Sequence, residues 1–287
     1  MIDLELLREL TAFKKYGTLS ATAKHLMITQ PSVTRGMQKL EEEMGVELFS
    51  RSVNRISLTP TGELAAAEAA KLLAAAENFQ TRVTNFDQMQ RYINVASVNS
   101  GALLLAKAEK DSFKQDLTFV DHLVPASAAE DMLRNYQARL VFTDFESQAA
   151  DIESMYLGEE HLSVKIDKFD PLSQKKSVTF ADLRGLTFLS VGEVGPWRQI
   201  TESNIPYARF LYQEDVGALD ELTNHSTFPV FRTNLTKAGI HDDPDDDRVL
   251  VPIDDPANKI EIYGTYLTSQ RQIVQPFLKD FVKKWPQ

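Results

Sequence analysis

Two absences narrow the class of this 287-residue protein. The sequence contains no cysteine, which excludes disulfide bonds and thiol-based redox sensing and fits a reducing cytoplasm. No apolar stretch approaches the ~20 residues that a membrane-spanning helix needs, and the start of the chain, with an acid at Asp3, does not have the pattern of a signal peptide. We therefore expect a cytoplasmic, soluble protein without a membrane partner.

Motifs of catalysis and metal binding are missing as well. The five histidines are scattered without metal-ligand spacing, and there is no G-x-S-x-G, no phosphate-binding loop and no H-E-x-x-H. The acidic run at 242–247 lacks the loop glycine and the final glutamate of an EF-hand, so we interpret it as a solvated turn. We expect no enzyme activity, no metal site and no cofactor.

Acidic residues give the chain a net charge of -10, yet two N-terminal stretches, 11–40 and 48–62, contain no acid. The basic residues of these stretches are Lys14, Lys15, Lys24, Arg35, Lys39, Arg51 and Arg55. Such a surface suits DNA phosphates, while the acidic remainder opposes indiscriminate binding. The alternative is a three-helix core domain whose solvent face happens to be basic.

Residues 18–43 predict two short helices that meet at a tight turn. Thr29 can cap the second helix and Pro31 falls in its first turn, where a missing N–H costs nothing. The outward polar residues of this helix are of the types that read base edges and phosphates in the major groove. The predicted DNA contacts are Gln30, Pro31, Ser32, Thr34, Arg35 and Gln38, with Arg51 and Arg55 in a basic wing that follows.

Over roughly the first 62 residues the sequence resembles the LysR-type bacterial transcriptional regulators. The matching positions are Gly17-Thr18-Leu19, Ala23, Leu26, Gln30-Pro31, Val33-Thr34-Arg35, Leu40-Glu41, Gly45-Val46, Leu48-Phe49, Arg51, Leu58-Thr59 and Gly62. Two positions depart from the pattern. Thr22 stands where the family usually has alanine, and Gly36 lies inside the recognition helix, where glycine costs about 1 kcal/mol relative to alanine. Gly36 either permits close approach to a phosphate or is a tolerated weak position.

A long helix is expected from Thr59-Pro60 to about residue 88. Its apolar positions alternate steps of four and three residues, which is a heptad seam that favours a partner helix. The residues predicted to form a dimer interface are Leu72, Ala76, Phe79, Val83 and Phe86. The alternative is that the seam packs on the C-terminal domain of its own chain. The family resemblance makes it the linker helix through which two subunits dimerise.

From residue 92 onward, strand-like and helical segments alternate, which predicts parallel sheets with crossover helices. Strands are expected at 92–97, 117–124, 140–143, 158–166, 186–191, 208–212, 228–232, 249–253 and 260–268, and helices at 101–111, 126–137, 180–183, 216–224 and 272–285. The resemblance implies a two-lobed α/β effector domain like the type 2 periplasmic-binding proteins. Lobe one would comprise 91–159 and 266–287, and lobe two 160–265.

Ligands of open α/β sheets bind beyond the carboxyl ends of the strands. After the first strand, residues 97–101 offer hydroxyls, an amide and helix N–H groups that suit a small carboxylate or other anion, although Ser and Asn before a helix are equally ordinary caps. The predicted effector contacts are Ser97, Asn99, Ser100, Thr143, Ser190 and Thr227. Near His225 and Phe228 the sequence lacks the glycine-rich turn common in the family, so the effector is unusual or absent.

The sequence therefore predicts an α+β multidomain protein with a winged helix-turn-helix domain (1–60), a linker helix (61–90) and an effector domain (91–287). Its expected function is sequence-specific, DNA-binding regulation of transcription. The expected partners are double-stranded DNA, a second copy of the chain in a homodimer or tetramer, and a small metabolite, with RNA polymerase as a further candidate. The alternatives are an effector-independent regulator, or a small-molecule-binding protein or enzyme with a helical appendage.

Overall fold

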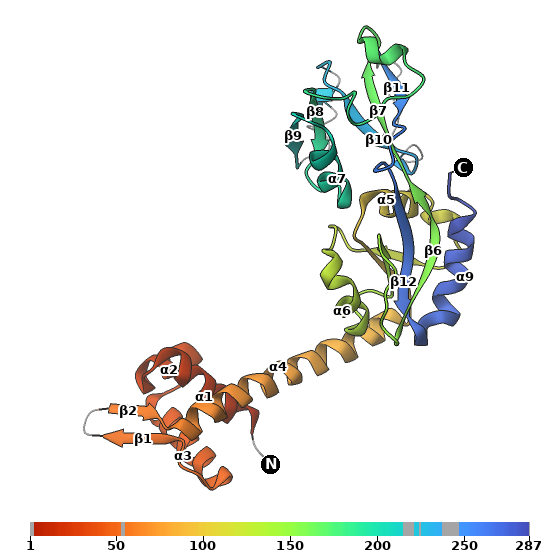
Figure 1. Ribbon diagram of the computed structural model, residues 1–287. Helices are drawn as coiled ribbons and strands as arrows, with labels where there is room; N and C mark the ends of the chain where they lie inside the picture. The colour runs from red at the N-terminus through yellow and green to blue at the C-terminus, as the bar shows by residue number, and fades with distance from the viewer. Residues whose placement is uncertain (1–2, 53–54, 215–220, 224, 237–246, 287) are drawn as a thin grey trace. The chain divides into compact units, whose positions relative to one another are not determined.

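The computed structural model describes residues 3–52, 55–214, 221–223, 225–236 and 247–286. The chain divides into two compact units, Met1–Thr84 and Asn85–Gln287 (Figure 1). The acidic run at 242–247 and the helix expected at 216–224 lie largely outside the described residues. Within the described part, no helix is long and apolar enough to cross a membrane.

The first unit is built from three short helices, a two-stranded wing and the start of a long helix. Its elements are α1 (Leu4–Tyr16), α2 (Leu19–Leu26), α3 (Gln30–Met44), β1 (Phe49–Ser52), β2 (Arg55–Leu58) and α4 (Pro60–Met89). The side chains of Asp3, Thr18 and Thr29 cap the first three helices at their N-termini. Gly17 and Gly45, both in the left-handed region, end α1 and α3. These local signals explain why the predicted and observed helix bounds agree closely.

The two positions that depart from the family pattern, Thr22 and Gly36, both pack against neighbouring residues of the first unit. The side chain of Thr22 is fully buried, and its hydroxyl donates to Thr18 O at 2.8 Å. Gly36 leaves room for a neighbour, because a Cβ there would lie 1.9 Å from Glu9 Oε2 on α1. The atom that fills this room is the far end of the Glu9 side chain, and the two readings of Gly36 offered from the sequence stay predictions.

The first lobe of the second unit contains a mixed five-stranded sheet of order β4-β3-β5-β12-β6. Its strands are β3 (Ile93–Ser97), β4 (Leu117–Phe119), β5 (Leu140–Thr143), β6 (Ile152–Glu160) and β12 (Ile260–Leu267), and its helices are α5 (Ser100–Ala108), α6 (Ala129–Arg134) and α9 (Arg271–Val282). Figure 1 shows α9 on one face of the sheet and α6 on the other. Phe277 and Phe281 of α9 pack in the core with Phe142 of β5, whereas Leu133 of α6 packs with Val141.

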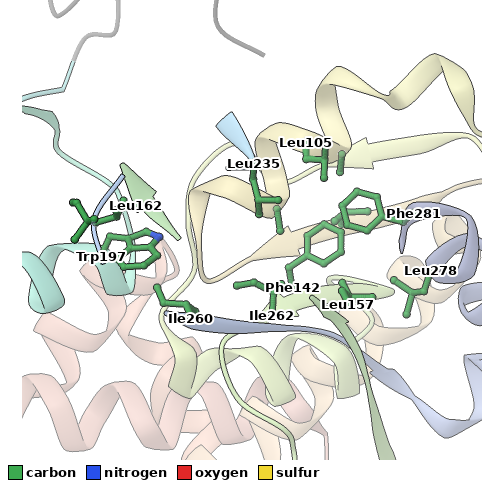
Figure 2. Packing of buried hydrophobic residues seen from close by; sticks show 14 of the residues in the cluster. Leu105, Phe142, Leu157, Leu162, Trp197, Leu235, Ile260, Ile262, Leu278 and Phe281 are labelled. Carbon is green, nitrogen blue, oxygen red and sulfur yellow. The ribbon is translucent and has the colours of Figure 1, made fainter. Parts of the chain in front are cut away.

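The second lobe contains another mixed sheet, of order β11-β7-β10-β8-β9. Its elements are β7 (Leu162–Asp167), β8 (Thr187–Val191), α7 (Pro196–Asn204), β9 (Arg209–Gln213), β10 (Val230–Thr233) and β11 (Arg248–Pro252). The core extends from one lobe into the other, since Trp197, Leu162 and Ile260 belong to the same cluster of buried residues as Phe281 (Figure 2).

Several predictions for this unit need correction. The single strand expected at 158–166 is two strands, β6 and β7, which lie in different sheets. The chain returns to the first sheet at Ile260 rather than at the predicted Tyr266. Helix α7 was not predicted, and the short helix expected at 180–183 is a turn. Both sheets are mixed rather than parallel, because β6, β7, β11 and β12 pair antiparallel with their neighbours.

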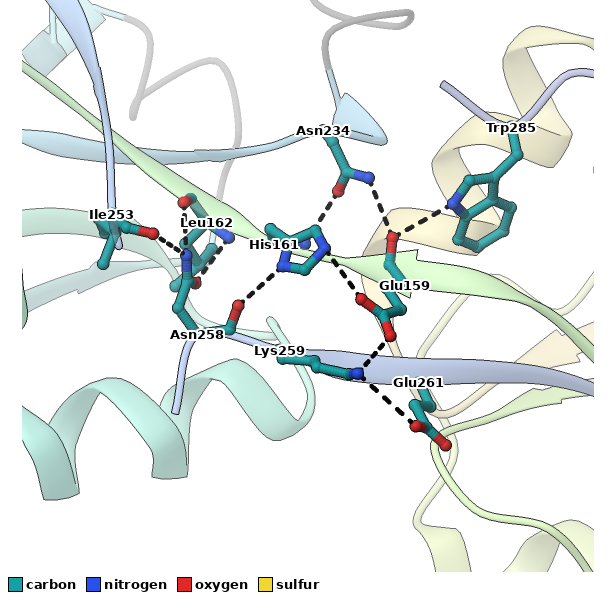
Figure 3. A network of polar contacts seen from close by, with 9 residues as sticks. All are labelled: Glu159, His161, Leu162, Asn234, Ile253, Asn258, Lys259, Glu261 and Trp285. Carbon is teal, nitrogen blue, oxygen red and sulfur yellow. Dashed lines mark hydrogen bonds and ion pairs between the residues drawn. The ribbon is translucent and has the colours of Figure 1, made fainter. Parts of the chain in front are cut away.

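The chain crosses between the lobes twice, once between β6 and β7 and again between β11 and β12. We call these two crossings and the polar side chains around them the lobe junction (Figure 3). The side chain of Asn258 accepts from Leu162 N at 2.8 Å and donates to the carbonyls of Leu162 and Ile253 at 2.9 and 2.7 Å. Asn234 accepts from His161 N at 2.9 Å. Trp285 of the C-terminal segment donates to Glu159 O at 3.2 Å. The junction is thus held by side-chain hydrogen bonds to backbone groups.

Candidate functional site

The N-terminal turn of α3 presents polar groups to solvent. Thr29 Oγ1 accepts from Ser32 N at 3.3 Å, and the first turn of the helix contains no acid. Val33, Met37 and Leu40 point into the core of the first unit, so they fix which side of α3 remains outward. A helix N-terminus with this exposure offers positive potential and donors to a phosphate.

The predicted contact residues of α3 differ in how they are engaged. Gln30, Pro31, Arg35 and Gln38 are exposed, whereas Ser32 and Thr34 are half-buried. Gln30 Oε1 accepts from Ser20 Oγ at 3.3 Å, and Thr34 Oγ1 donates to Gln30 O at 3.1 Å. Arg35 and Gln38 are therefore two long polar side chains of α3 that are exposed for contact with base edges.

The wing follows α3 and carries the two predicted arginines. Arg51 lies on β1 with about half of its side chain exposed, and its Nη2 is 3.5 Å from Glu41 Oε2. The same glutamate accepts from Leu48 N and Phe49 N at 2.8 and 2.9 Å, so it anchors the wing to α3. Arg55 begins β2, and its side chain lies outside the described residues.

A second candidate site is a cavity of about 1020 Å³ between the two lobes of the second unit. Lobe one contributes Ser100, Leu103 and Lys107 of α5, and lobe two contributes residues of β8, β9, β10 and α7. Many of the lining side chains are apolar, among them Trp197 and Phe210. A pocket of this volume and lining suits a small organic molecule.

Only two of the six predicted effector residues line this cavity, namely Ser100 and Ser190. Ser97, Asn99 and Thr143 are fully buried, and Thr227 is exposed on a loop outside the lining. Ser97 Oγ donates to Asn99 O at 2.5 Å, and Asn99 Oδ1 caps Ala102 N at 3.3 Å. The hydroxyl of Thr143 lies 2.8 Å from that of Thr265 on β12. The hydroxyls of Ser97 and Thr143 and Oδ1 of Asn99 form contacts within the lobe, and none of the three residues lines the cavity, so the prediction that they face the cleft is corrected.

The charges of the cavity are balanced among the described residues. Its lining includes three basic side chains and three acidic ones, namely Lys107, Arg198, Arg232, Asp121, Glu193 and Glu214. Arg198 is already engaged, with its Nε 3.2 Å from Glu202 Oε1 and its guanidinium 4.1 Å from the ring centre of Tyr212. Burial and the hydrogen bond to Glu202 raise the pKa of Tyr212 to about 12. Glu193 accepts from Leu123 N at 3.3 Å, which links the two lobes across the cavity.

Comparison with known proteins places these features in one family. Residues 4–63 match the model of the family described as bacterial regulatory helix-turn-helix protein, lysR family. The chain is 26% identical over 196 residues to the Hca operon transcriptional activator HcaR of Escherichia coli (strain K12), covering 67% of this chain and 66% of HcaR. Residues 4–63 are thus a LysR-family helix-turn-helix domain, and the chain as a whole is similar to LysR-type transcriptional regulators.

Other LysR-family relatives and structures agree. A probable RuBisCO transcriptional regulator of Trichormus variabilis is 24% identical over 234 residues, covering 77% of this chain and 69% of the relative. Vibrio fischeri DarR in complex with DNA has a TM-score of 0.61 at 17% identity, covering 98% of both chains. Full-length OxyR from Pseudomonas aeruginosa has a TM-score of 0.53 at 20% identity, covering 99% of this chain and 95% of OxyR. These structures share the two-domain LysR fold. The curated matches span about two thirds of the length of each relative.

The seam of α4 is exposed over its central part. Leu72, Phe79 and Val83 expose 50%, 71% and 55% of their surface, whereas Ala69 nearer the start is buried in the core of the first unit. Phe86 also packs edge-on against Tyr136, with ring centres 5.1 Å apart. The central part of the seam therefore has an apolar face in solvent, whereas Phe86 at its end belongs to the second unit and packs within that unit.

Sequence reasoning missed several site residues. Trp197, Arg198 and Thr201 lie on α7, which was not predicted although Gly195-Pro196 is an ordinary helix start. In the first unit, the rings of Tyr16 and His25 lie with centres 4.3 Å apart and planes inclined by 37°, and this pair joins α1 to α2. Spacing within one helix does not reveal a pair formed between two helices.

Proposed function

We propose that the protein binds a specific operator through α3 and acts as a regulator of transcription in the cytoplasm rather than as an enzyme. The observation that carries this proposal is the exposed N-terminal half of α3, where Arg35 and Gln38 extend into solvent from a helix whose opposite face is buried. Arginine and glutamine form bidentate hydrogen bonds with guanine and adenine, respectively. Arg51 and Arg55 of the wing then contact phosphates or the minor groove.

We propose further that two copies of the chain associate through the seam of α4. Leu72, Ala76, Phe79, Val83 and Phe86 are the residues of this interface. An isolated helix with large apolar side chains in water would gain free energy by covering them, and heptad spacing matches a partner helix. Two recognition helices would then read half-sites about one turn of DNA, or a multiple of it, apart. A tetramer formed from two such dimers and a contact with RNA polymerase are extensions of the same proposal.

The cavity between the lobes is the proposed effector site. Its support is the volume, the apolar lining and the contribution of both lobes, because a ligand that contacts two lobes stabilises one arrangement of them over another. The second candidate is an effector-independent regulator. It is favoured by Ser97, Asn99 and Thr143, which are fully buried and lie outside the lining of the cavity.

Selection of bound genomic fragments with the purified protein tests the proposed function. Fragments that share a motif of two related half-sites, protected from cleavage at fixed salt concentration, would support operator binding by a dimer. Recovery of fragments without a shared motif would contradict it. The effector proposal is tested separately, by screening small metabolites for changes in the melting temperature of the parent protein and in its affinity for the selected operator.

A further inference from the structure

Glu160 has an environment that is unusual for a carboxyl group. It is the last residue of β6, at the lobe junction, and its surface is fully buried. Among the described residues, neither of its carboxyl oxygens has a hydrogen-bond partner of ordinary geometry. Leaving a buried acceptor unsatisfied costs free energy, more so when the group is charged. A buried acid without a partner therefore calls for a functional explanation.

The carboxyl group of Glu160 lies against the first turn of α5. A Cβ on Gly101 would be 2.0 Å from Glu160 Oε1, so the absence of a side chain at Gly101 makes room for the acid. The neighbouring residue Ser100 lines the interlobe cavity. Thr233 of β10 and Trp197 of α7, which also line the cavity, are close enough to influence the acid. Glu160 thus fills the space directly behind the inner wall of the cavity, where the two lobes meet.

The start of α5 is the place where a ligand's negative group would be most stable. The N-terminal end of a helix carries partial positive charge and free N–H groups. The carboxyl group of Glu160 lies beside this first turn, next to Gly101, without accepting a hydrogen bond from its N–H groups. Burial raises the pKa of Glu160 to about 7, while Thr233 and Trp197 lower it by less. A second carboxylate brought to the same helix end would meet both the volume and, when Glu160 is ionised, the charge of this acid.

The rest of the cavity offers no net positive charge that would attract a carboxylate in place of the helix start. Its three basic and three acidic lining residues balance, and Arg198 is held by Glu202. Trp197 Nε1 has no hydrogen-bond partner of ordinary geometry among the described residues, and it lies close enough to the Glu160 carboxyl to lower its pKa, so one buried donor and one buried acceptor stand together at the inner wall. A ligand with both a donor and an acceptor, such as an amide or an alcohol, matches these groups better than an anion does.

We propose that Glu160 is the specificity-determining residue of the interlobe cavity: its carboxyl group lies beside the first turn of α5, directly behind the cavity wall, so that the cavity takes neutral or amine-bearing ligands and excludes carboxylates. This inference rests on the proposed effector role of the cavity. It reverses the ligand class expected from residues 97–101 in the sequence.

The first test removes the side-chain carboxyl of Glu160 and supplies a carboxylate in solution, as acetate. In full-length Glu160→Ala, acetate can enter the space that the side chain has left. At ten times its dissociation constant, acetate should raise the melting temperature by about 3 °C or more relative to sodium chloride of equal ionic strength. The parent and Glu193→Ala, which removes a carboxyl that lines the cavity, should show no such difference. Equal melting temperatures of Glu160→Ala in acetate and in chloride would overturn the proposal.

The second test uses Glu160→Gln, which keeps the shape of the side chain and removes its charge. Benzoate and benzamide are the probes, because they differ in the group that would face Glu160. The parent should bind benzamide more tightly than benzoate, and the difference should shrink at least several-fold in Glu160→Gln. Benzoate binding to the parent as tightly as benzamide would contradict the assignment. If acetate stabilises Glu160→Ala but neither probe nor any metabolite binds the parent, the position of the acid is supported and the effector role of the cavity fails.

Discussion

Replacing Glu160 by glutamine should stabilise the second unit in a pH-dependent way. The carboxyl group is fully buried, and burial raises its pKa from the ordinary value of 4.5 to about 7. Because the folded-state pKa is the higher one, protonated Glu160 contributes stability that is fully present below about pH 4.5 and is lost as the pH rises through about 7. At about 1.4 kcal/mol per pKa unit, the parent should lose roughly 3 kcal/mol across this window. Glu160→Gln has no such proton to lose, so its advantage over the parent should be larger at pH 8 than at pH 5.

Tryptophan fluorescence offers a direct assay, since both tryptophans of the chain, Trp197 and Trp285, belong to the second unit. Urea unfolding of the full chain is followed at pH 5 and pH 8 for the parent, Glu160→Gln and Glu159→Gln. The hydrogen bond from Lys259 lowers the pKa of Glu159 below its ordinary value of 4.5, so its contribution to stability is lost only as the pH falls, opposite in sign to that of Glu160, and this neighbour serves as the control. A stability difference between Glu160→Gln and the parent that is the same at both pH values would refute the reasoning.

Two further predictions concern the seam of α4 and the lobe junction. Phe79→Asp combined with Val83→Asp should give a monomer in sedimentation equilibrium, because both charges would be placed in an apolar interface. The control Lys71→Ala should leave the measured mass unchanged. A double variant that stays dimeric would show that the dimer forms elsewhere. Asn258→Ala should lower the free energy of unfolding by about 2–4 kcal/mol in the fluorescence assay, since three buried backbone groups lose their partner, and a loss below about 0.5 kcal/mol would mean that water replaces the side chain.

The helix-turn-helix was predictable because its signals are local. Thr18, Thr29, Gly17 and Gly45 cap or end helices a few residues away, and the resemblance to the LysR family covered the same region. In the second unit, 158–166 was predicted as one strand, although β6 ends at Glu160 and β7 begins at Leu162, because the single residue between them, His161, is not a turn former. What separates them is pairing with strands far along the chain: β6 pairs with β12, and β7 pairs with β10 and β11. Such pairing leaves no local signal.

The effector cleft was the least predictable part. Thr143 was expected to face a ligand, but its partner is Thr265, which is 122 residues away. An acid at the end of a strand, such as Glu160, is ordinarily exposed, and only the folded chain brings it against Gly101. The position of a strand end can be read from the sequence. The direction of its side chains depends on contacts between distant segments, and these decide what a pocket binds.

Recognition of an operator by α3 is tested most directly by measuring the affinity of Arg35→Ala for DNA. Fluorescence anisotropy gives dissociation constants for the selected operator and for a scrambled duplex at one salt concentration. Arg8→Ala is the control, because Arg8 is an exposed arginine of α1 that is paired with Glu5. Loss of a base contact should weaken operator binding by about 1–3 kcal/mol and leave the scrambled duplex nearly unaffected. Operator binding by Arg35→Ala as tight as that by Arg8→Ala would contradict the account.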